Sequence, residues 1–552
     1  MPAPSEGSDP EELADRLARL ERRLSLIEKR LEIDQESPLE SRPPDSAAED
    51  AEHREEDLEN RIGENWFPRV GITVLVIGVV FLLSFPFQGL PAVLPSLFGY
   101  LLVGGAMGLS RHWRISFPGM SRYVRAGALV LLYFTTLRLY FFSTDPPITD
   151  IRVEVFLLLL VVVVTVFASL RARSQFLVAL SLTTGFITAL ISGDPWIAIP
   201  VNTVLALATV AIARRHMWSA LLLYGTVLTY VTHLLWVLND PVVGNPVALM
   251  PPTPANMLPI LFYAVIFAAG TLFRRDPVKE QGIVITNSFV NALASGGLYL
   301  IVTAARGGDA LALYQTIASG LFLCIAIFFW QKEESKYSTF FYAMLGYLAL
   351  SVAMIALFNR PDYFIWLAWQ SLLVVSTAVW FRSQFIVITN FVIYIILFAA
   401  YALLVDSVHV VSLSFGIVAI ASARILNWQK ARLALKTEMM RNAYLACAFF
   451  IFPFALYHAL PRGYVSISWV AVALFYYAMS ILVKSRKYRW MAFLTLLLTI
   501  GHVLFVDSVT LEPAYRILSF LVLGAVLFWI SLKYAKKRAR GTSPEIPHEL
   551  HN

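Results

Sequence analysis

This 552-residue chain has little charge: Asp, Glu, Lys and Arg make up only 15% of it, whereas 58% of the residues are hydrophobic. A soluble protein of this length needs more charged residues to cover its surface, so a soluble globular domain is excluded. Apolar runs of about 18 or more residues recur along the chain, as is typical of transmembrane helices. The composition predicts an all-α integral membrane protein with many membrane spans.

Cysteine is also scarce, and the motifs of soluble enzymes are missing. The two cysteines, Cys324 and Cys447, lie in apolar segments, which argues against a disulfide framework and against a cysteine-based metal site. The sequence has no HExxH, no glycine-rich phosphate loop and no GxSxG turn. We therefore expect no metal and no cofactor, and an enzymatic role is disfavoured.

The charge is distributed unevenly. Residues 1–65 contain 20 Asp and Glu against 9 Lys and Arg, whereas residues 66–552 contain 17 against 35. Basic residues of membrane proteins gather in cytoplasmic loops, so this excess indicates orientation and argues against nucleic-acid binding. In alternate loops, 29 basic residues fall on one predicted side and six on the other, namely Arg138, Arg152, Arg306, Arg360, Arg462 and Arg516.

These counts predict a multi-pass membrane protein with both termini in the cytoplasm. The first apolar run starts only near Trp66, and nothing before it resembles a signal peptide. The lipid bilayer is the first expected partner, and no substrate is identified.

The first 65 residues are predicted to lie outside the membrane. Residues 1–33 are expected to form a cytoplasmic coiled-coil helix that joins protomers into a homo-oligomer, or an amphipathic helix that lies on a neighbour or on the membrane. Residues 34–65 are acidic and rich in Pro and Ser, as in a disordered linker. The apolar heptad positions are Leu13, Leu17, Leu20, Leu24, Ile27 and Leu31.

Residues 66–534 are predicted to form one polytopic domain of about 18 transmembrane helices, give or take two, arranged as tandem hairpins, followed by a basic cytoplasmic tail at 535–552. The hexamer LLVDSV at 403–408 returns as LFVDSV at 504–509, which is 101 positions later. This spacing equals about two hairpins and indicates internal similarity. We interpret Asp406 and Asp507 as N-caps, because an aspartate before a helix accepts hydrogen bonds from its first N–H groups.

Three further segments resemble one known family. They are LENRIGENWFPRVGITVLVIGVVFLLSF at 58–85, TTGFITALIS at 183–192 and VDSVTLEPAYRILSFLVLGAVLFWISLKY at 506–534. They resemble a bacterial family of predicted multi-spanning membrane proteins described only as a domain of unknown function, number 2339. The resemblance, over residues 58–534, implies a coiled coil, an acidic linker and a many-helix membrane domain, but no activity. Ala189 departs from the family, which often has proline there.

Ionisable residues near the predicted outer ends of the helices are the first candidates for function, because charge is costly inside a bilayer. We expect Asp507 and Arg516 to pair there, with His502 about one and a half turns deeper. Arg516 would bind an anion or a lipid headgroup and His502 would relay protons; alternatively, the pair only stabilises a turn. The candidate outward polar pocket comprises His502, Asp507, Arg516, Asp406, His409, Arg138 and Glu154.

Polar amides near the middle of the predicted helices are the second candidates. They either line a solute path or hydrogen-bond to neighbouring helices. Asn287 and Asn291 are four positions apart and should face the same way. The candidate lining comprises Asn287, Asn291, Gln315 and Asn390, with Asn202 and Gln370 in similar positions.

Three functions stay open. The first is a transporter or channel-like protein for a small or amphiphilic solute, which the number of helices and the buried polar residues favour. The second is a membrane scaffold that recruits partners through its coiled coil. The third is an intramembrane enzyme that acts on a lipid-linked substrate at the outer leaflet, with His502, Asp507 and Arg516 in its site. A deep cavity with convergent polar groups would favour the first or the third.

Overall fold

The computed structural model describes residues 67–85, 91, 93–142, 146–251, 253–272, 282–305, 308–333, 335–405, 411–428 and 437–541. All regular structure within these ranges is helical, and they contain no strand. The prediction of an all-α chain is therefore confirmed. The predicted coiled coil at 1–33, the linker at 34–65, Asp406, His409 and residues 542–552 lie outside the described residues.

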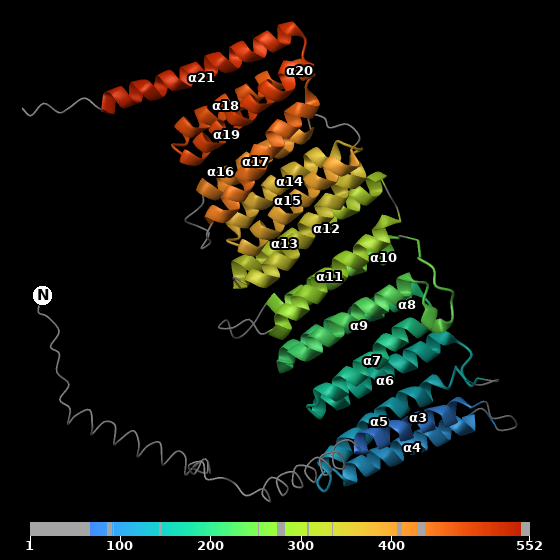
Figure 1. The fold of residues 1–552 in the computed structure, drawn as a ribbon. Helices are drawn as coiled ribbons and strands as arrows, with labels where there is room; N and C mark the ends of the chain where they lie inside the picture. Colours follow the sequence, from blue (N-terminus) through green and yellow to red (C-terminus); the bar gives the residue numbers. More distant parts are fainter. Residues whose placement is uncertain are drawn as a thin grey trace, which may run out of the picture. The chain divides into compact units, whose positions relative to one another are not determined.

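The part of the chain that the structure describes contains eighteen long helices (Figure 1). The helices are α3 (Phe67–Ser84), α4 (Val93–His112), α5 (Pro118–Leu137), α6 (Ile151–Arg171), α7 (Gln175–Ile191), α8 (Pro195–His216), α9 (Ser219–Val237), α10 (Pro254–Leu272), α11 (Gly282–Ala304), α12 (Gly308–Glu333), α13 (Lys336–Leu357), α14 (Tyr363–Trp380), α15 (Gln384–Leu404), α16 (Val411–Trp428), α17 (Thr437–Ala459), α18 (Val465–Leu482), α19 (Arg486–His502) and α21 (Pro513–Gly541). A short π-helix, η4 (Val503–Asp507), and the three-residue α20 (Ser508–Thr510) follow α19.

Fourteen of these helices are long and apolar enough to cross a membrane. α3, α7 and α10 contain shorter apolar stretches, and α5 belongs to neither group. The chain is thus a membrane protein with many candidate spans. The exact number of crossings and the tandem repetition of hairpins stay predictions.

Helices α7 and α15 each begin after a tight turn, in which a residue with left-handed backbone is followed by a serine. Arg173 and Arg382 adopt left-handed φ values of 49° and 52°, and each is followed by a serine that caps the next helix. Ser174 Oγ accepts a hydrogen bond from Leu177 N, and Ser383 Oγ accepts one from Ile386 N. The left-handed residue reverses the chain and the serine satisfies a free N–H of the new helix. Short connections of this kind make successive helices antiparallel.

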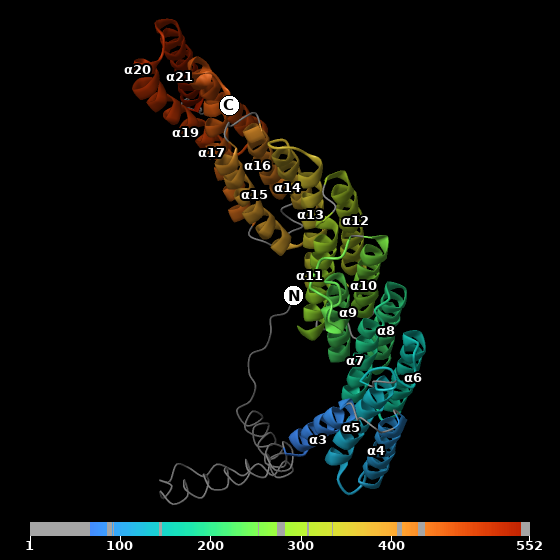
Figure 2. The ribbon, with the colours of Figure 1, turned by 90° about the vertical axis from the view of Figure 1, so that its right-hand side faces the viewer.

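The chain divides into two compact units. The smaller unit comprises residues 1–82 and 104–128, and in its described part Ser110 and Ser121 hydrogen-bond to each other's backbone carbonyl oxygens (2.9 and 2.7 Å). The larger unit comprises residues 83–103 and 129–552. Its helices pack mainly on partners one or two places away in the sequence, and Figures 1 and 2 show them side by side. One continuous apolar core runs through it from Tyr133 to Ala492.

Close packing within this unit depends on glycine where two helices approach. In α11, a Cβ atom added to Gly296 would lie 2.5 Å from Leu345 Cδ1 of α13, whereas one added to Gly297 would meet nothing within 4 Å. Adjacent glycines therefore have opposite surroundings. Gly296 faces a neighbouring helix, and Gly297 faces open space.

We predict that Gly296→Leu destabilises the protein, because a leucine there forces α11 and α13 apart and costs about 1–3 kcal/mol. Gly297→Leu is the matched control, with the same residue change and the same helix. Thermal unfolding of the two purified variants in detergent measures the difference. Equal unfolding temperatures would contradict the packing described for α11 and α13.

Candidate functional site

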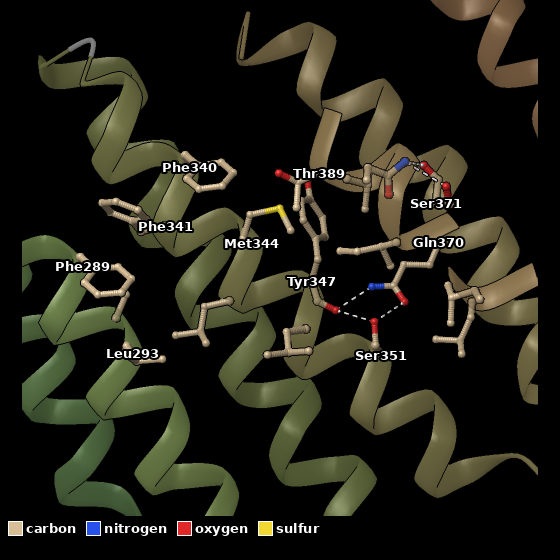
Figure 3. Close-up of a pocket in the computed structure, with 18 residues that line it drawn as sticks. Phe289, Leu293, Phe340, Phe341, Met344, Tyr347, Ser351, Gln370, Ser371 and Thr389 are labelled. Carbon is tan, nitrogen blue, oxygen red and sulfur yellow. Dashed lines mark hydrogen bonds between the residues drawn. The ribbon is translucent and has the colours of Figure 1, made fainter. Parts of the chain in front are cut away.

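A groove opens between α11, α13, α14 and α15 (Figure 3). Its volume is about 430 Å³, which lies within the range of small-molecule pockets. Phe289 and Leu293 of α11 line one side, together with Phe341 of α13. Leu293 and Leu348 at the groove are 58% and 54% exposed. The groove thus opens on the apolar outer surface of the helices, which faces lipid in a membrane.

Polar groups of α13 and α14 meet at one wall of this groove (Figure 3). Gln370 Nε2 donates a hydrogen bond to the backbone oxygen of Tyr347 (2.6 Å). Ser351 Oγ lies 3.0 Å from this oxygen and 3.0 Å from Gln370 Oε1, so its single hydrogen is shared between two acceptors. Gln370 keeps a second N–H, and both side chains keep lone pairs. The wall therefore has hydrogen-bonding capacity left for a ligand.

Two residues of α15 complete the polar wall. Thr389 lines the groove, and its hydroxyl has no hydrogen-bond partner among the described residues. Asn390 Nδ2 is already bonded, to Ser371 Oγ (2.9 Å) and to the Tyr444 hydroxyl (3.1 Å). Thr389 is hence available to a ligand, whereas the Asn390 amide nitrogen holds α15 against α14 and α17.

The wall lies near the middle of its helices. Gln370 is the eighth residue of the 18-residue α14, and Tyr347 is the twelfth residue of the 22-residue α13. No Asp, Glu, Lys, Arg or His is among the residues that line the groove. The site is therefore uncharged and mostly apolar, with its hydrogen-bonding groups at mid-depth.

The other predicted amides are used for helix packing. Asn291 Nδ2 donates to Ala264 O (2.9 Å) and to the Tyr342 hydroxyl (2.7 Å). Asn202 Nδ2 makes the same pair of bonds, to a backbone oxygen and a tyrosine hydroxyl (3.2 Å each). Asn287 Oδ1 accepts from Thr226 (2.7 Å), and Gln315 donates to Thr303 (2.8 Å). None of these four amides lines the groove.

His502 and Asp507 lie in contact at the end of α19. His502 Nδ1 is 3.2 Å from Asp507 Oδ1 and 2.9 Å from Ser466 Oγ of α18. Asp507 is 1% exposed, and its Oδ2 has no hydrogen-bond partner among the residues that the structure describes. The π-helix explains this contact, because its wider turn brings side chains five positions apart onto one face.

Two predictions for this region are wrong. Asp507 is not an N-cap: its backbone is helical (φ −63°, ψ −36°) and its side chain makes no capping bond, because the helix runs on through Thr510. Arg516 does not pair with Asp507 among the described contacts, since its Nη2 donates to Leu511 O (3.0 Å). The chain leaves the helix at Leu511, and this freed carbonyl takes the guanidinium instead.

Arg138 and Glu154, two further members of the predicted outward pocket, lie elsewhere. Arg138 Nη2 donates to Phe85 O (3.3 Å). Glu154 is fully buried in the first turn of α6, and neither carboxylate oxygen has a partner. Among the described residues no ion pair joins Arg138 or Glu154 to the His502–Asp507 pair. Of the five members that the structure describes, it thus brings together only His502 and Asp507.

Sequence reasoning missed most of the groove. Ser351, Tyr347 and Thr389 have no unusual sequence context, because serine, tyrosine and threonine are common in membrane helices. Gln370 could have pointed to the groove from the sequence, because an amide at the centre of an apolar helix requires a hydrogen-bond partner. Ser466 was missed for the same reason as Ser351.

Comparison with known proteins gives one match. The model of the family described as "Predicted membrane protein (DUF2339)" matches residues 63–459, which include the groove and Glu154 but not the His502–Asp507 pair. This match confirms the resemblance inferred from the sequence. No curated protein and no solved structure matches the chain.

We predict that Asp507→Ala lowers the free energy of unfolding by about 1.5–3 kcal/mol, because it removes the carboxyl oxygen that lies 3.2 Å from Nδ1 of the partly buried His502 and leaves the imidazole without this contact. Glu512→Ala is the control, since Glu512 is an exposed carboxylate in the same connection. Thermal unfolding in detergent compares the two variants. If Asp507→Ala is as stable as Glu512→Ala, the contact with His502 contributes nothing to the fold.

Proposed function

We propose, since the chain belongs to the predicted membrane protein family DUF2339, that it transports an uncharged amphiphile between the two leaflets of the membrane through the groove of α11, α13, α14 and α15. The observation that carries this proposal is the placement of the polar wall. Ser351, Gln370 and Thr389 lie at mid-depth, beside an apolar groove that opens laterally. The amphiphile would keep its chain in lipid while its head group passes this wall.

The physical argument concerns the head group of the amphiphile. A hydroxyl-bearing head loses its water when it enters the bilayer, and each unpaired polar group then costs several kcal/mol. The free N–H of Gln370 and the hydroxyls of Ser351 and Thr389 replace part of that water at the depth where the cost is highest. The groove therefore lowers the barrier to crossing without enclosing the apolar chain.

The lining also limits the ligand class. A phosphate or carboxylate head would lie at mid-depth with no cation beside it, because no basic residue lines the groove. A neutral head with several hydroxyls, such as a single sugar on a diacylglycerol, has the matching chemistry. The volume of about 430 Å³ is large enough for such a head and the first part of its chain.

The enzymatic alternative has less support. In a Ser–His–Asp site, the nucleophile and the orienting carboxylate contact opposite nitrogens of the histidine. Here Ser466 and Asp507 both contact Nδ1 of His502. This geometry fits a structural contact better than a proton relay. The scaffold alternative depends on residues 1–33, outside the described part of the chain.

We also propose that both termini are cytoplasmic, that the membrane is the bacterial inner membrane, and that the coil at Leu13–Leu31 joins protomers. The distribution of basic residues supports the orientation, since 29 of the 35 beyond residue 65 lie in one set of loops. The left-handed turn residues Arg173 and Arg382 belong to that set.

We predict that a neutral glycolipid with a photoactivatable chain crosslinks to the groove of the full-length protein in liposomes. Leu293→Trp should reduce both crosslinking and transfer between leaflets roughly tenfold, equivalent to about 1.4 kcal/mol of binding free energy, because the indole fills the groove. Ile301→Trp is the matched control: Ile301 is exposed on the same helix but does not line the groove. Equal crosslinking in both variants would show that the groove is not the binding site.

We predict that a fluorescent protein fused after Asn552 is bright in a bacterial host, and that alkaline phosphatase fused there is inactive. Fluorescent proteins mature in the cytoplasm, and the phosphatase requires the oxidising periplasm. The opposite result for the two fusions would reverse the proposed orientation. A fusion after Gly193, in a connection of the opposite set, should give the reverse pattern.

A further inference from the structure

The carboxylate of Glu154 is buried, and among the described contacts it has neither a hydrogen bond nor an ion pair. It lies in the first turn of α6, is 0% exposed, and neither Oε1 nor Oε2 has a hydrogen-bond partner in the described part of the chain. A charged group in this position costs several kcal/mol unless it is paired. The surroundings of Glu154 therefore decide what compensates the carboxylate.

Tyr100 of α4 lies within electrostatic range of Glu154 but does not donate to it. Its hydroxyl is 3.1 Å from Thr136 Oγ1. Thr136 uses its own hydrogen on Leu132 O (2.9 Å). The phenol must therefore donate to Thr136, and its oxygen has only lone pairs left.

Tyr133 of α5 is arranged in the same way. It also lies within electrostatic range of Glu154, and its hydroxyl is 2.9 Å from Thr188 Oγ1 of α7. Thr188 donates its own hydrogen to Thr184 O (2.8 Å). Tyr133 hence donates to Thr188, and again only lone pairs remain. Both phenols near the carboxylate are acceptors.

Two more hydroxyls lie at the same level. Ser96 is in the first turn of α4 and Thr135 in the last turn of α5, at the helix ends that adjoin the start of α6. Both are buried, and neither oxygen has a hydrogen-bond partner. Oxygen atoms of three consecutive helices are thus available within about one turn of one another in depth.

The charged groups nearby do not neutralise Glu154. Arg138 is directed to Phe85 O, and the described contacts include no ion pair between Arg138 and Glu154. Asp150 and Arg152 are exposed at the start of α6. α7, which packs along α6, has no ionisable side chain. The carboxylate therefore supplies one negative charge and the two phenols supply lone pairs, while the hydroxyls of Ser96 and Thr135 and the Nε and Nη1 atoms of Arg138 keep unused hydrogens among the described contacts.

We infer that Glu154 binds a small cation, either a proton or an alkali-metal ion, together with the phenolic oxygens of Tyr100 and Tyr133. Oxygen ligands with a single carboxylate suit a hard monovalent cation. This inference does not rest on the groove of α11 and α13–α15. If both hold, the cation site supplies a means of coupling transport to an ion gradient.

The test uses dicyclohexylcarbodiimide, an apolar reagent that modifies protonated carboxyl groups within the membrane. The full-length protein in liposomes is treated over a range of pH, and peptide mass spectrometry reports the modified residue. We expect a single rapid modification at Glu154. Glu154→Gln should lose it and remain folded, because the amide has the same shape. Glu438, which is exposed, serves as the internal control.

Adding sodium, potassium or lithium chloride separates the two cations. An alkali ion in the site slows the modification roughly tenfold at about ten times its dissociation constant, whereas choline chloride has no effect. If no alkali ion protects and the rate falls only as the pH rises, the site binds a proton. If Glu154 stays unmodified at every pH in folded protein, its charge is compensated internally and the inference is wrong. This outcome leaves glycolipid crosslinking at the groove unaffected.

Discussion

Hydrogen bonds between buried polar side chains of neighbouring helices are the interaction on which the larger unit depends. Lipid offers no partner to a polar group, so each amide or hydroxyl between two membrane helices must find its partner in the protein. Asn202, Asn291 and Asn390 solve this problem in the same way. Each donates to a backbone oxygen of one neighbouring helix and to a tyrosine hydroxyl of another. One side chain thereby fixes three helices at one depth, and the apolar contacts around it fill the remaining space.

Against this background, the groups that are not fully satisfied stand out. Ser351 and Gln370 keep unused hydrogen-bonding capacity beside an open groove, and the carboxylate of Glu154 has no hydrogen bond among the described residues. A membrane protein would gain stability by replacing Glu154 with an apolar residue, because an apolar side chain needs no partner there, whereas Gln370 joins α14 to α13 and keeps one further N–H unused. The presence of the polar wall and of Glu154 is explained if each binds a ligand that is not part of the chain. The two sites differ in charge, which is why a neutral head group suits one and a cation suits the other.

Much of the helix layout followed from the sequence, whereas the sites did not. Apolar runs bounded by basic or Pro-containing connections located the helices, because hydrophobic length is a local property. Gln370 and Asn390 were recognisable as buried amides for the same reason. The contact of His502 with Asp507 was not, since it requires one extra residue in a helical turn, and no residue type signals a π-helix. The isolation of Glu154 depends on the direction in which two distant tyrosines donate, which no local pattern encodes.

The packing of helices on partners one or two places away has a consequence for how the protein is made. Most helix–helix contacts in the larger unit join helices one or two places apart in the sequence, so the loops that these contacts close are short for a chain of this length and little chain entropy opposes assembly. A helix leaving the ribosome finds its neighbours already inserted, and each polar cross-link can close within a few tens of residues of synthesis. The Asn–Tyr bonds span 61, 51 and 54 positions. The membrane domain is therefore suited to growth one hairpin at a time, with each new pair of helices closing the bonds left open by the pair before it.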